Sequence, residues 1–412
     1  MKLKTGLLSN KTRLDAIPYL FAIVTLFITF LNETFYWPIM RFFNVYASNG
    51  FIDLQYVLRR ADCYHDLGNA VYTSGGYSLA AGWTTCFNYW YGETLLIFLS
   101  RVRLGLENTL VLGYFLIGLF SFLYGKLIEI SLRLSYHKSR LAVTSLLVLY
   151  ASPITWFLVQ RGNIDLLIAS LIICSYFLFT NRRYLLAFFL LFVATIFKFY
   201  TVPALFVIAL WASGYWRKIF YLCSSLFATF LVLSSYSKVP GLKQKLDSME
   251  QLFGFKYMST WLNATLTYEI NARQELALNF LVFAVTFFVC LPVLWKSIEV
   301  KEPGSHQSPL LTFGPIAFFI YFFGANVDYR LVLVVLILIL VLMLNDEIIF
   351  GDFKRIFVVF VTVISFACLL SYPSGKLQIL GDFSVSLLIS FLLVAFLKRI
   401  RMLVTIPLGA HR

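Results

Sequence analysis

Short polar clusters interrupt this otherwise apolar chain, and their side chains suit acid–base chemistry and the binding of an anion. The first cluster, Gln160–Asp165, puts an arginine and an aspartate into a tight Gly162-Asn163 turn between two hydrophobic segments. A charge at a membrane boundary is costly unless it has a partner or a task, so Arg161 and Asp165 are candidate functional residues. Asp165 follows Arg161 by about one helical turn, and a purely structural ion pair between them is the alternative.

Two further turns supply cations. Lys198 stands between apolar segments, where its ammonium could bind a phosphate as a point charge or extend from a helix end to the interface. Arg330 carries a planar fork suited to a phosphate or carboxylate, and Asp328 could orient it. A structural pair of Arg330 with Asp328 or Asp165 is the alternative.

A candidate general base lies in the segment Gly50–Cys63, whose pattern predicts an amphipathic helix at the membrane surface. Asp53, near its start, could deprotonate an acceptor hydroxyl. Aspartate is also favoured at helix starts, so a capping role for Asp53 is the alternative. Asp62 and Asp66 are rival bases close by.

The elements that must position these residues are membrane helices. The chain has 412 residues, of which 60% are hydrophobic and 13% charged, and a soluble protein cannot hide that much apolar surface. The sequence therefore predicts an all-α polytopic membrane protein, a single integral domain over residues 1–412 with about twelve spans. The expected spans are Ile17–Ile39, Leu110–Leu132, Leu141–Leu158, Ile164–Phe179, Tyr184–Phe197, Thr201–Ser213, Ile219–Leu233, Leu276–Trp295, Leu310–Phe323, Leu331–Leu344, Ile356–Leu370 and Phe383–Leu397.

Loop charge predicts the orientation of these spans. The net charge of +14 lies in short loops between apolar segments, a pattern typical of membrane orientation rather than of nucleic-acid binding. With a cytoplasmic amino terminus, every short inner loop carries at least two basic residues. Two long outer loops, 44–108 and 234–274, then face outward together with the polar clusters. The expected location is the bacterial inner membrane, with the site on its outer face.

Other motifs narrow the chemistry. Cys63 and Cys86 share the first outer loop and could form a disulfide in an oxidising compartment. The sequence has no metal-ligand spacing, no Gly-rich phosphate loop and no nucleotide-binding domain, so neither a metal nor a bound cofactor is expected. Cations beside an apolar surface instead predict a lipid-phosphate ligand.

Several of these motifs resemble glycosyltransferase family 87, a group of mannosyltransferase-like enzymes with the C-type membrane glycosyltransferase fold. The matching segments are Asp53-Leu54-x-Tyr56, Gly68-x-x-Val71-Tyr72, Asn88-Tyr89, Arg161-Gly162-Asn163-x-Asp165-Leu166-Leu167, Lys198-Phe199-Tyr200 and Asp328-Tyr329-Arg330. The resemblance extends from about residue 50 to residue 345. The Arg59-Arg60 pair and the two cysteines of the first outer loop depart from the typical pattern.

The resemblance implies an inverting transfer of a sugar from a polyprenyl-phosphate carrier to a cell-envelope glycan or glycolipid. Asp53 is then the base, and cations hold the carrier phosphate as it leaves. The predicted substrate-binding residues are Arg60, Arg161, Asp165, Lys198, Asp328, Tyr329 and Arg330.

Two other functions remain open on the sequence. A transporter or flippase for a lipid-linked or anionic solute could use the same cations, and would contain broken helices and ionisable residues at mid-membrane depth. A non-catalytic membrane scaffold would tolerate the loss of Asp53, Lys198 and Arg330 together.

Overall fold

The structure is a computed structural model of the chain, and it describes the residues in twelve ranges. These are 14–35, 51–67, 93–134, 136–237, 252–253, 272–301, 308–323, 326–327, 330–345, 348–350, 353–370 and 378–405.

The chain divides into two compact units that alternate along the sequence. The first unit contains residues 1–129 and 157–249, and the second contains residues 130–156 and 250–412. The single integral domain over residues 1–412 stays a prediction.

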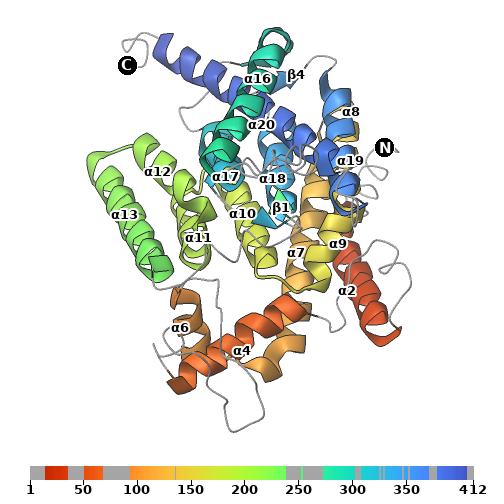
Figure 1. The fold of residues 1–412 in the computed structure, drawn as a ribbon, viewed down its shortest axis with the longest axis vertical. Coiled ribbons are helices and arrows are strands. Elements are labelled where there is room, and N and C mark those ends of the chain that lie inside the picture. Colours follow the sequence, from red (N-terminus) through yellow and green to blue (C-terminus); the bar gives the residue numbers. More distant parts are fainter. Residues whose placement is uncertain are drawn as a thin grey trace, which may run out of the picture. The chain divides into compact units, whose positions relative to one another are not determined.

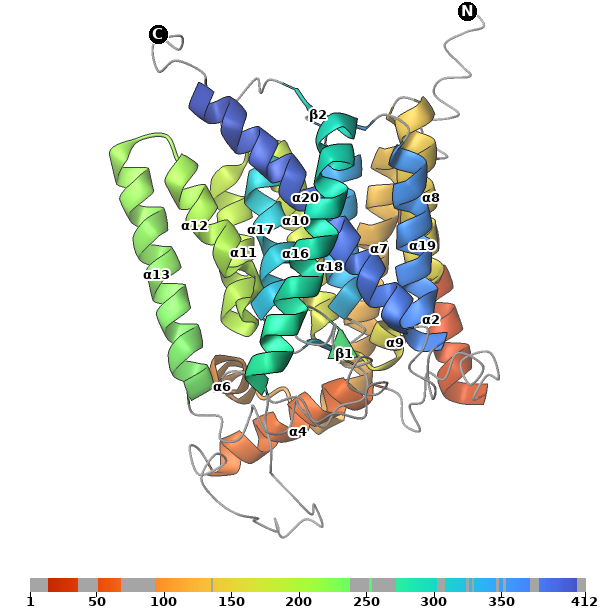
Figure 2. The same cartoon turned by 45° about the horizontal axis from the view of Figure 1, so that its top comes forward.

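The first unit is built from helices (Figures 1 and 2). Its elements are α2 (Ile17–Phe35), α4 (Ile52–Leu67), α6 (Glu93–Arg101), η1 (Leu106–Asn108), most of α7 (Thr109–Leu132), the end of α9 (Pro153–Gln160), α10 (Asp165–Thr180), α11 (Tyr184–Phe197), η2 (Phe199–Thr201), α12 (Val202–Trp211) and α13 (Tyr215–Ser237).

The second unit adds two short antiparallel strand pairs to its helices. Strand β1 pairs with β3, with Leu252 opposite Val327, and β2 pairs with β4, with Glu299 opposite Ile349. Its elements are α8 (Tyr136–Ala151), β1 (Leu252–Phe253), α16 (Ala272–Ser297), β2 (Ile298–Val300), α17 (Pro309–Phe323), β3 (Asn326–Val327), α18 (Leu331–Leu338), the π-helix η5 (Ile339–Met343), β4 (Ile348–Phe350), α19 (Phe353–Leu370) and α20 (Gln378–Thr405).

Several helices are long and apolar enough to cross a bilayer. Within the described ranges four qualify, Leu106–Leu132, Tyr215–Ser234, Phe280–Ser297 and Phe383–Met402, and a bent pair of helices would make a fifth. The expectation of a helical membrane protein is thereby confirmed. The count of twelve spans is not confirmed, because several of the expected spans form helices of 10 to 17 residues.

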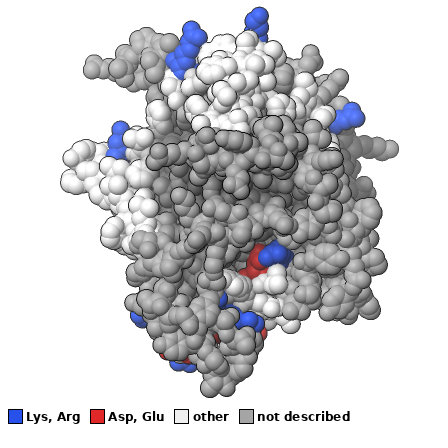
Figure 3. Space-filling model, viewed as in Figure 1, with Lys and Arg blue, Asp and Glu red and all other residues white. Residues whose placement is uncertain are grey.

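Helices α13 and α16 expose large apolar side chains, as contact with lipid tails requires. In the qualifying windows of α13 and α16, 22% is buried, and Phe230 and Phe288 are among their exposed side chains. On the face in Figure 3 the described surface is mostly white, with few charged side chains. Exposed large apolar side chains on such helices are typical of a surface that meets a membrane.

Helix α4 confirms that the segment Gly50–Cys63 contains a helix, and it takes a different direction from α7 and α13. Figures 1 and 2 both show α4 lying crosswise to the axes of α7 and α13. It buries Leu54, Val57 and Leu58 and exposes Asp66, so one side packs on the protein. This direction brings the first turn of α4 to the turn that follows α9.

A small residue lets α2 pack closely on α7. A Cβ atom on Gly125 would lie 2.7 Å from the Cα of Pro18 and 3.2 Å from the carbonyl oxygen of Ile17. Both are backbone atoms, so the helix would have to move to make room. At Gly118, earlier in the same helix, the nearest atom to an added Cβ would be a Leu26 methyl carbon at 3.5 Å, an ordinary contact.

We therefore expect Gly125→Ala to lower the free energy of unfolding by about 1–3 kcal/mol, the usual cost of overpacking. Gly118→Ala is the matched control and should leave the unfolding midpoint near that of the unaltered protein. Thermal unfolding in detergent, followed by helical circular dichroism, measures both. Equal midpoints for the two variants would mean that α2 does not pack this closely on α7.

Candidate functional site

The site begins where the first turn of α4 meets the turn that follows α9. The backbone N–H of Phe51 donates to the carbonyl of Gln160 at 2.9 Å, and the N–H groups of Asp53 and Leu54 donate to the carbonyl of Arg161 at 3.0 and 3.4 Å. The first N–H groups of a helix have no partner inside it. Here the carbonyls at the end of α9 provide those partners and fix α4 in place.

Phe51, directly before α4, has a left-handed backbone conformation at this junction. Its φ is +59°, its side chain is fully buried, and its ring packs edge-on against Tyr114 at 5.3 Å. A Cβ atom on Gly113 or on Gly162 would lie within 2.7 or 2.9 Å of that ring. Gly162 itself has a φ of +58°, a conformation that glycine adopts without strain. Both glycines are therefore needed for the ring to fit.

A bend in the chain directs α9 toward this junction. The helices Arg140–Ala151 and Pro153–Gln160 meet at 51°. Proline has no N–H for the helical ladder and so leaves a carbonyl without its usual partner. The hydroxyls of Ser152 and Thr155 donate to the carbonyl of Leu149 at 2.5 and 2.6 Å, which satisfies it.

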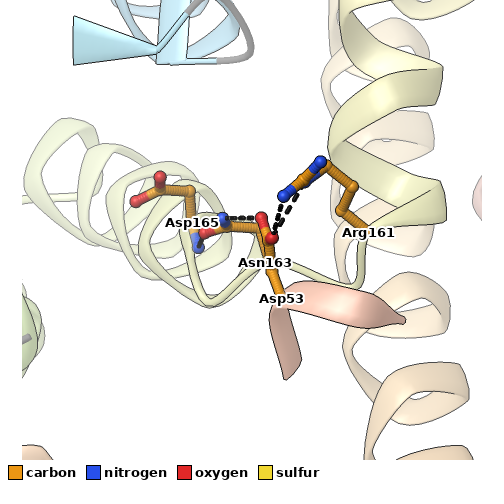
Figure 4. Close-up of polar contacts among 4 residues, drawn as sticks. All are labelled: Asp53, Arg161, Asn163 and Asp165. Atoms are coloured by element: carbon orange, nitrogen blue, oxygen red, sulfur yellow. Dashed lines mark hydrogen bonds and ion pairs between the residues drawn. The ribbon is translucent and has the colours of Figure 1, made fainter. Parts of the chain in front are cut away.

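Asp53 is held by two side chains from the turn after α9 (Figure 4). The Nε and Nη2 atoms of Arg161 donate to Oδ1 of Asp53 at 2.8 and 2.5 Å, and Nδ2 of Asn163 donates to Oδ2 at 2.6 Å. The side chains of Arg161 and Asp53 are 28% and 12% exposed, so solvent reaches this pair. Both oxygens of the Asp53 carboxylate therefore accept hydrogen bonds from Arg161 and Asn163, rather than capping α4 as the alternative had it.

Asn163 joins this pair to the start of α10. Its Oδ1 accepts the backbone N–H of Asp165 at 2.9 Å, and its side chain is fully buried. Figure 4 shows the amide lying between Asp53 and the backbone of Asp165. Sequence reasoning placed this asparagine in the tight turn without giving it a role. Its position two residues before an aspartate that begins a helix was the available signal.

Asp165 pairs with Lys198, so the predicted pairing of Arg161 with Asp165 is wrong. The ammonium of Lys198 lies 2.7 Å from Oδ1 of Asp165, and the two side chains are 2% and 0% exposed. Figure 4 shows the Asp165 carboxyl directed away from Asp53. Arg161 takes Asp53 instead, because α4 brings a carboxylate to the turn that the local sequence does not contain. The burial of Lys198 favours a structural pair over direct contact with a phosphate.

The turn at Lys198 separates α11 from α12, as the sequence predicted. Lys198 is extended (φ −149°, ψ 132°), and its N–H donates to the carbonyl of Ala194 at 2.8 Å. The hydroxyls of Thr195 and Thr201 both donate to the carbonyl of Leu191, at 2.9 and 3.0 Å. Lys198 also lies 5.7 Å from the centre of the Tyr200 ring. These contacts fix the stem that carries the ammonium to Asp165.

The rival carboxylates have other partners. Oδ2 of Asp62 accepts the N–H of Leu106 at 3.0 Å, at the start of η1. Burial raises the pKa of Asp62 above its usual value, and the hydrogen bond from Leu106 opposes that shift. Asp66 is half-exposed and lies 3.2 Å from His65. Asp53 is thus the carboxylate of α4 that the structure joins to the Arg161 turn.

Other predicted residues of α4 lie further along the helix. Arg60 is buried at 4% exposure and lies 5.1 Å from the centre of the Tyr56 ring. Burial raises the pKa of Tyr56, while the charge of Arg60 lowers it. Cys63 is disulfide-bonded, and Cys86, its predicted partner, lies outside the described residues.

The last predicted cluster belongs to the second unit. Arg330 precedes α18 and is partly buried. Asp328 and Tyr329 lie outside the described residues. The roles of these three residues stay predictions. Within the described part of the chain, no group of three or more histidine, cysteine or acidic side chains is arranged to hold a metal ion.

Comparison with known proteins adds no relative to this geometry: no protein-family model, no curated protein and no solved structure matches the chain.

The buried pair of Lys198 and Asp165 makes a prediction about stability. Removing one partner leaves the other charge buried and uncompensated, which costs about 3–5 kcal/mol. We expect Lys198→Met to lower the free energy of unfolding by that amount. Lys198→Met combined with Asp165→Asn should recover most of the loss, because no buried charge then remains from the pair.

Thermal unfolding of the two variants measures this cycle. Lys218→Met is the control, since Lys218 is exposed and its loss should move the midpoint little. A Lys198→Met variant as stable as the Lys218→Met control would show that the pair does not exist in the protein.

Proposed function

We propose that the chain is a membrane glycosyltransferase that moves a sugar from a polyprenyl-phosphate carrier to a cell-envelope glycan or glycolipid, with inversion. The observation that supports this most is the junction of Asp53 with Arg161. It puts a partly exposed carboxylate and a partly exposed guanidinium in contact, at the first turn of a helix that lies crosswise to α7 and α13. A sugar phosphate on a lipid needs both a base for the acceptor and a cation for the phosphate.

In this proposal Asp53 accepts the proton of the acceptor hydroxyl. The hydroxyl oxygen then bonds to the anomeric carbon of the sugar, and the bond from that carbon to the carrier phosphate breaks on the opposite face. The electron pair of the broken bond leaves with the phosphate, and the configuration at the carbon inverts. The proton ends on Asp53, from which solvent can take it because the side chain is 12% exposed.

Arg161 is the cation proposed for the phosphate. Its Nε and Nη2 face Asp53, and a guanidinium also carries donors on Nη1 that suit a phosphate oxygen. Such a preplaced charge stabilises the leaving group as its negative charge develops. Lys198 contributes indirectly in this scheme, by holding Asp165 and with it the start of α10.

The resemblance of the motifs to glycosyltransferase family 87 supports the choice of donor. It also supports a site on the outer face of a bacterial inner membrane. Under this proposal Arg60 belongs to the substrate site of the first unit. Asp328, Tyr329 and Arg330 stay predicted substrate-binding residues.

The proposal predicts that Asp53→Asn lowers sugar transfer by about 100-fold or more, the usual contribution of a general base. Purified protein incubated with a panel of polyprenyl-phosphate sugars and an envelope glycolipid fraction, with carrier-phosphate release as the readout, measures this. Asp62→Asn is the matched control, because it makes the same change on the same helix and keeps an acceptor for the N–H of Leu106. Transfer that survives Asp53→Asn would remove Asp53 as the base.

A second candidate function is transport of a lipid-linked or anionic solute. The observation that favours it is the 51° bend between Arg140–Ala151 and Pro153–Gln160, since bent or broken helices line the binding sites of many transporters. Protein reconstituted in vesicles would then move a fluorescent polyprenyl phosphate between leaflets. Leaflet exchange without release of carrier phosphate would favour transport over transfer.

A further inference from the structure

The amide of Asn163 has one possible orientation in this structure. Its Oδ1 faces the backbone N–H of Asp165 at 2.9 Å, and an N–H group can be bonded only by an acceptor. The amide nitrogen must therefore point the other way, and it lies 2.6 Å from Oδ2 of Asp53. Because the side chain is fully buried, water does not compete for either contact.

The two oxygens of Asp53 are held in different ways. Oδ1 is held by Arg161, a charged side chain that is 28% exposed and can exchange partners. Oδ2 is held by Asn163, a neutral and fully buried donor. A neutral donor fixes the position of a carboxylate without cancelling its charge. The buried contact can therefore persist while Arg161 turns to another anion.

We propose that Asn163 is the positioning residue of the site, whose amide nitrogen holds the Asp53 carboxylate in the orientation needed to accept a proton. This inference rests on the proposed function. The competing explanation is that Asn163 only caps α10, through its Oδ1 contact with the N–H of Asp165.

The two explanations use different atoms of the same side chain, and Asn163→Asp separates them. Aspartate caps a helix as well as asparagine does, so a capping role predicts an unchanged protein. A positioning role predicts a large effect, because the donor is replaced by a second carboxylate beside Asp53. Two carboxylates at that separation do not both ionise readily, and their titration is coupled.

The first measurement is the pH profile of sugar transfer. With Asn163→Asp we expect the acidic limb of kcat/KM to move to higher pH by at least about one unit, which is tenfold less transfer on that limb. Asn181→Asp is the matched control. Asn181 is the C-cap at the other end of α10, where its side chain is exposed, and its variant should keep the profile of the unaltered protein. A profile unchanged by Asn163→Asp would overturn the positioning role.

The second measurement does not need activity. The folded Asn163→Asp protein should favour a proton shared by the two carboxylates, so their folded-state pKa is raised above that of the unfolded chain. Its unfolding midpoint should therefore rise as the pH falls through that raised pKa, relative to Asn181→Asp. Equal midpoints across pH would show that Asp53 and Asn163 are not in contact, and the proposal would fall.

Exchanging the two residues tests the contact even if a single variant folds poorly. Asp53→Asn alone points one amide nitrogen at another, whereas Asp53→Asn with Asn163→Asp restores a donor facing an acceptor. The exchanged protein should recover the unfolding midpoint and still transfer sugar at least about 100-fold more slowly, because the carboxylate now lies on the wrong side of the contact. If the exchange does not recover the midpoint, the contact is refuted.

The two measurements also distinguish the failure of this inference from the failure of the proposed function. Transfer by the unaltered protein combined with an unchanged Asn163→Asp profile refutes the positioning role alone. If the unaltered protein transfers no sugar from any carrier in the panel, the proposed function fails and the role of Asn163 falls with it. The unfolding series then still reports whether the contact exists.

Discussion

The junction between α4 and the turn after α9 is the interaction on which the candidate site depends. Three N–H groups at the start of α4 donate to two carbonyls at the end of α9, and the carboxylate of Asp53 takes two side chains from the same turn. At its other end α4 is held by Asp62, which accepts the N–H of Leu106 at 3.0 Å. The junction gives hydrogen-bond partners to N–H groups at the start of α4 that have none inside the helix. It also fixes the position of Asp53.

The two ion pairs of the site differ in exposure, and this difference decides what each can do. The pair of Lys198 and Asp165 is almost fully buried, so separating its charges would cost several kcal/mol. It acts as a fixed part of the framework. The pair of Arg161 and Asp53 is partly exposed, so solvent reaches both groups. It can therefore meet a solute, which the buried pair cannot.

Small residues and side-chain hydroxyls allow the chain to turn at the positions that carry the site. Gly113 and Gly162 leave room for the buried ring of Phe51. The Thr155 hydroxyl donates to the carbonyl of Leu149 at the bend before α9. The Thr201 hydroxyl donates to the carbonyl of Leu191 near the break after α11. In an apolar medium an unsatisfied carbonyl is costly, so a helix bends or ends where a neighbouring hydroxyl replaces the lost bond. The polar site thus sits in a helical framework whose backbone remains hydrogen-bonded.

The sequence by itself determined the class of the protein and the turns where its polar residues gather. Composition and apolar runs predicted membrane helices, and the tight turn at Gly162, the turn at Lys198 and the helix containing Asp53 were each predicted from local pattern. These features depend on residues close together in the chain, so a local pattern is enough to find them.

Only the tertiary structure decided which charges meet. Arg161 pairs with Asp53 from more than a hundred positions away rather than with nearby Asp165, and Asp165 pairs with Lys198. No periodicity records such contacts, because they follow from how α4, α10 and α11 pack together. The contact of Asn163 with Asp53 was hidden for the same reason, because α4 brings that carboxylate from more than a hundred positions away in the sequence.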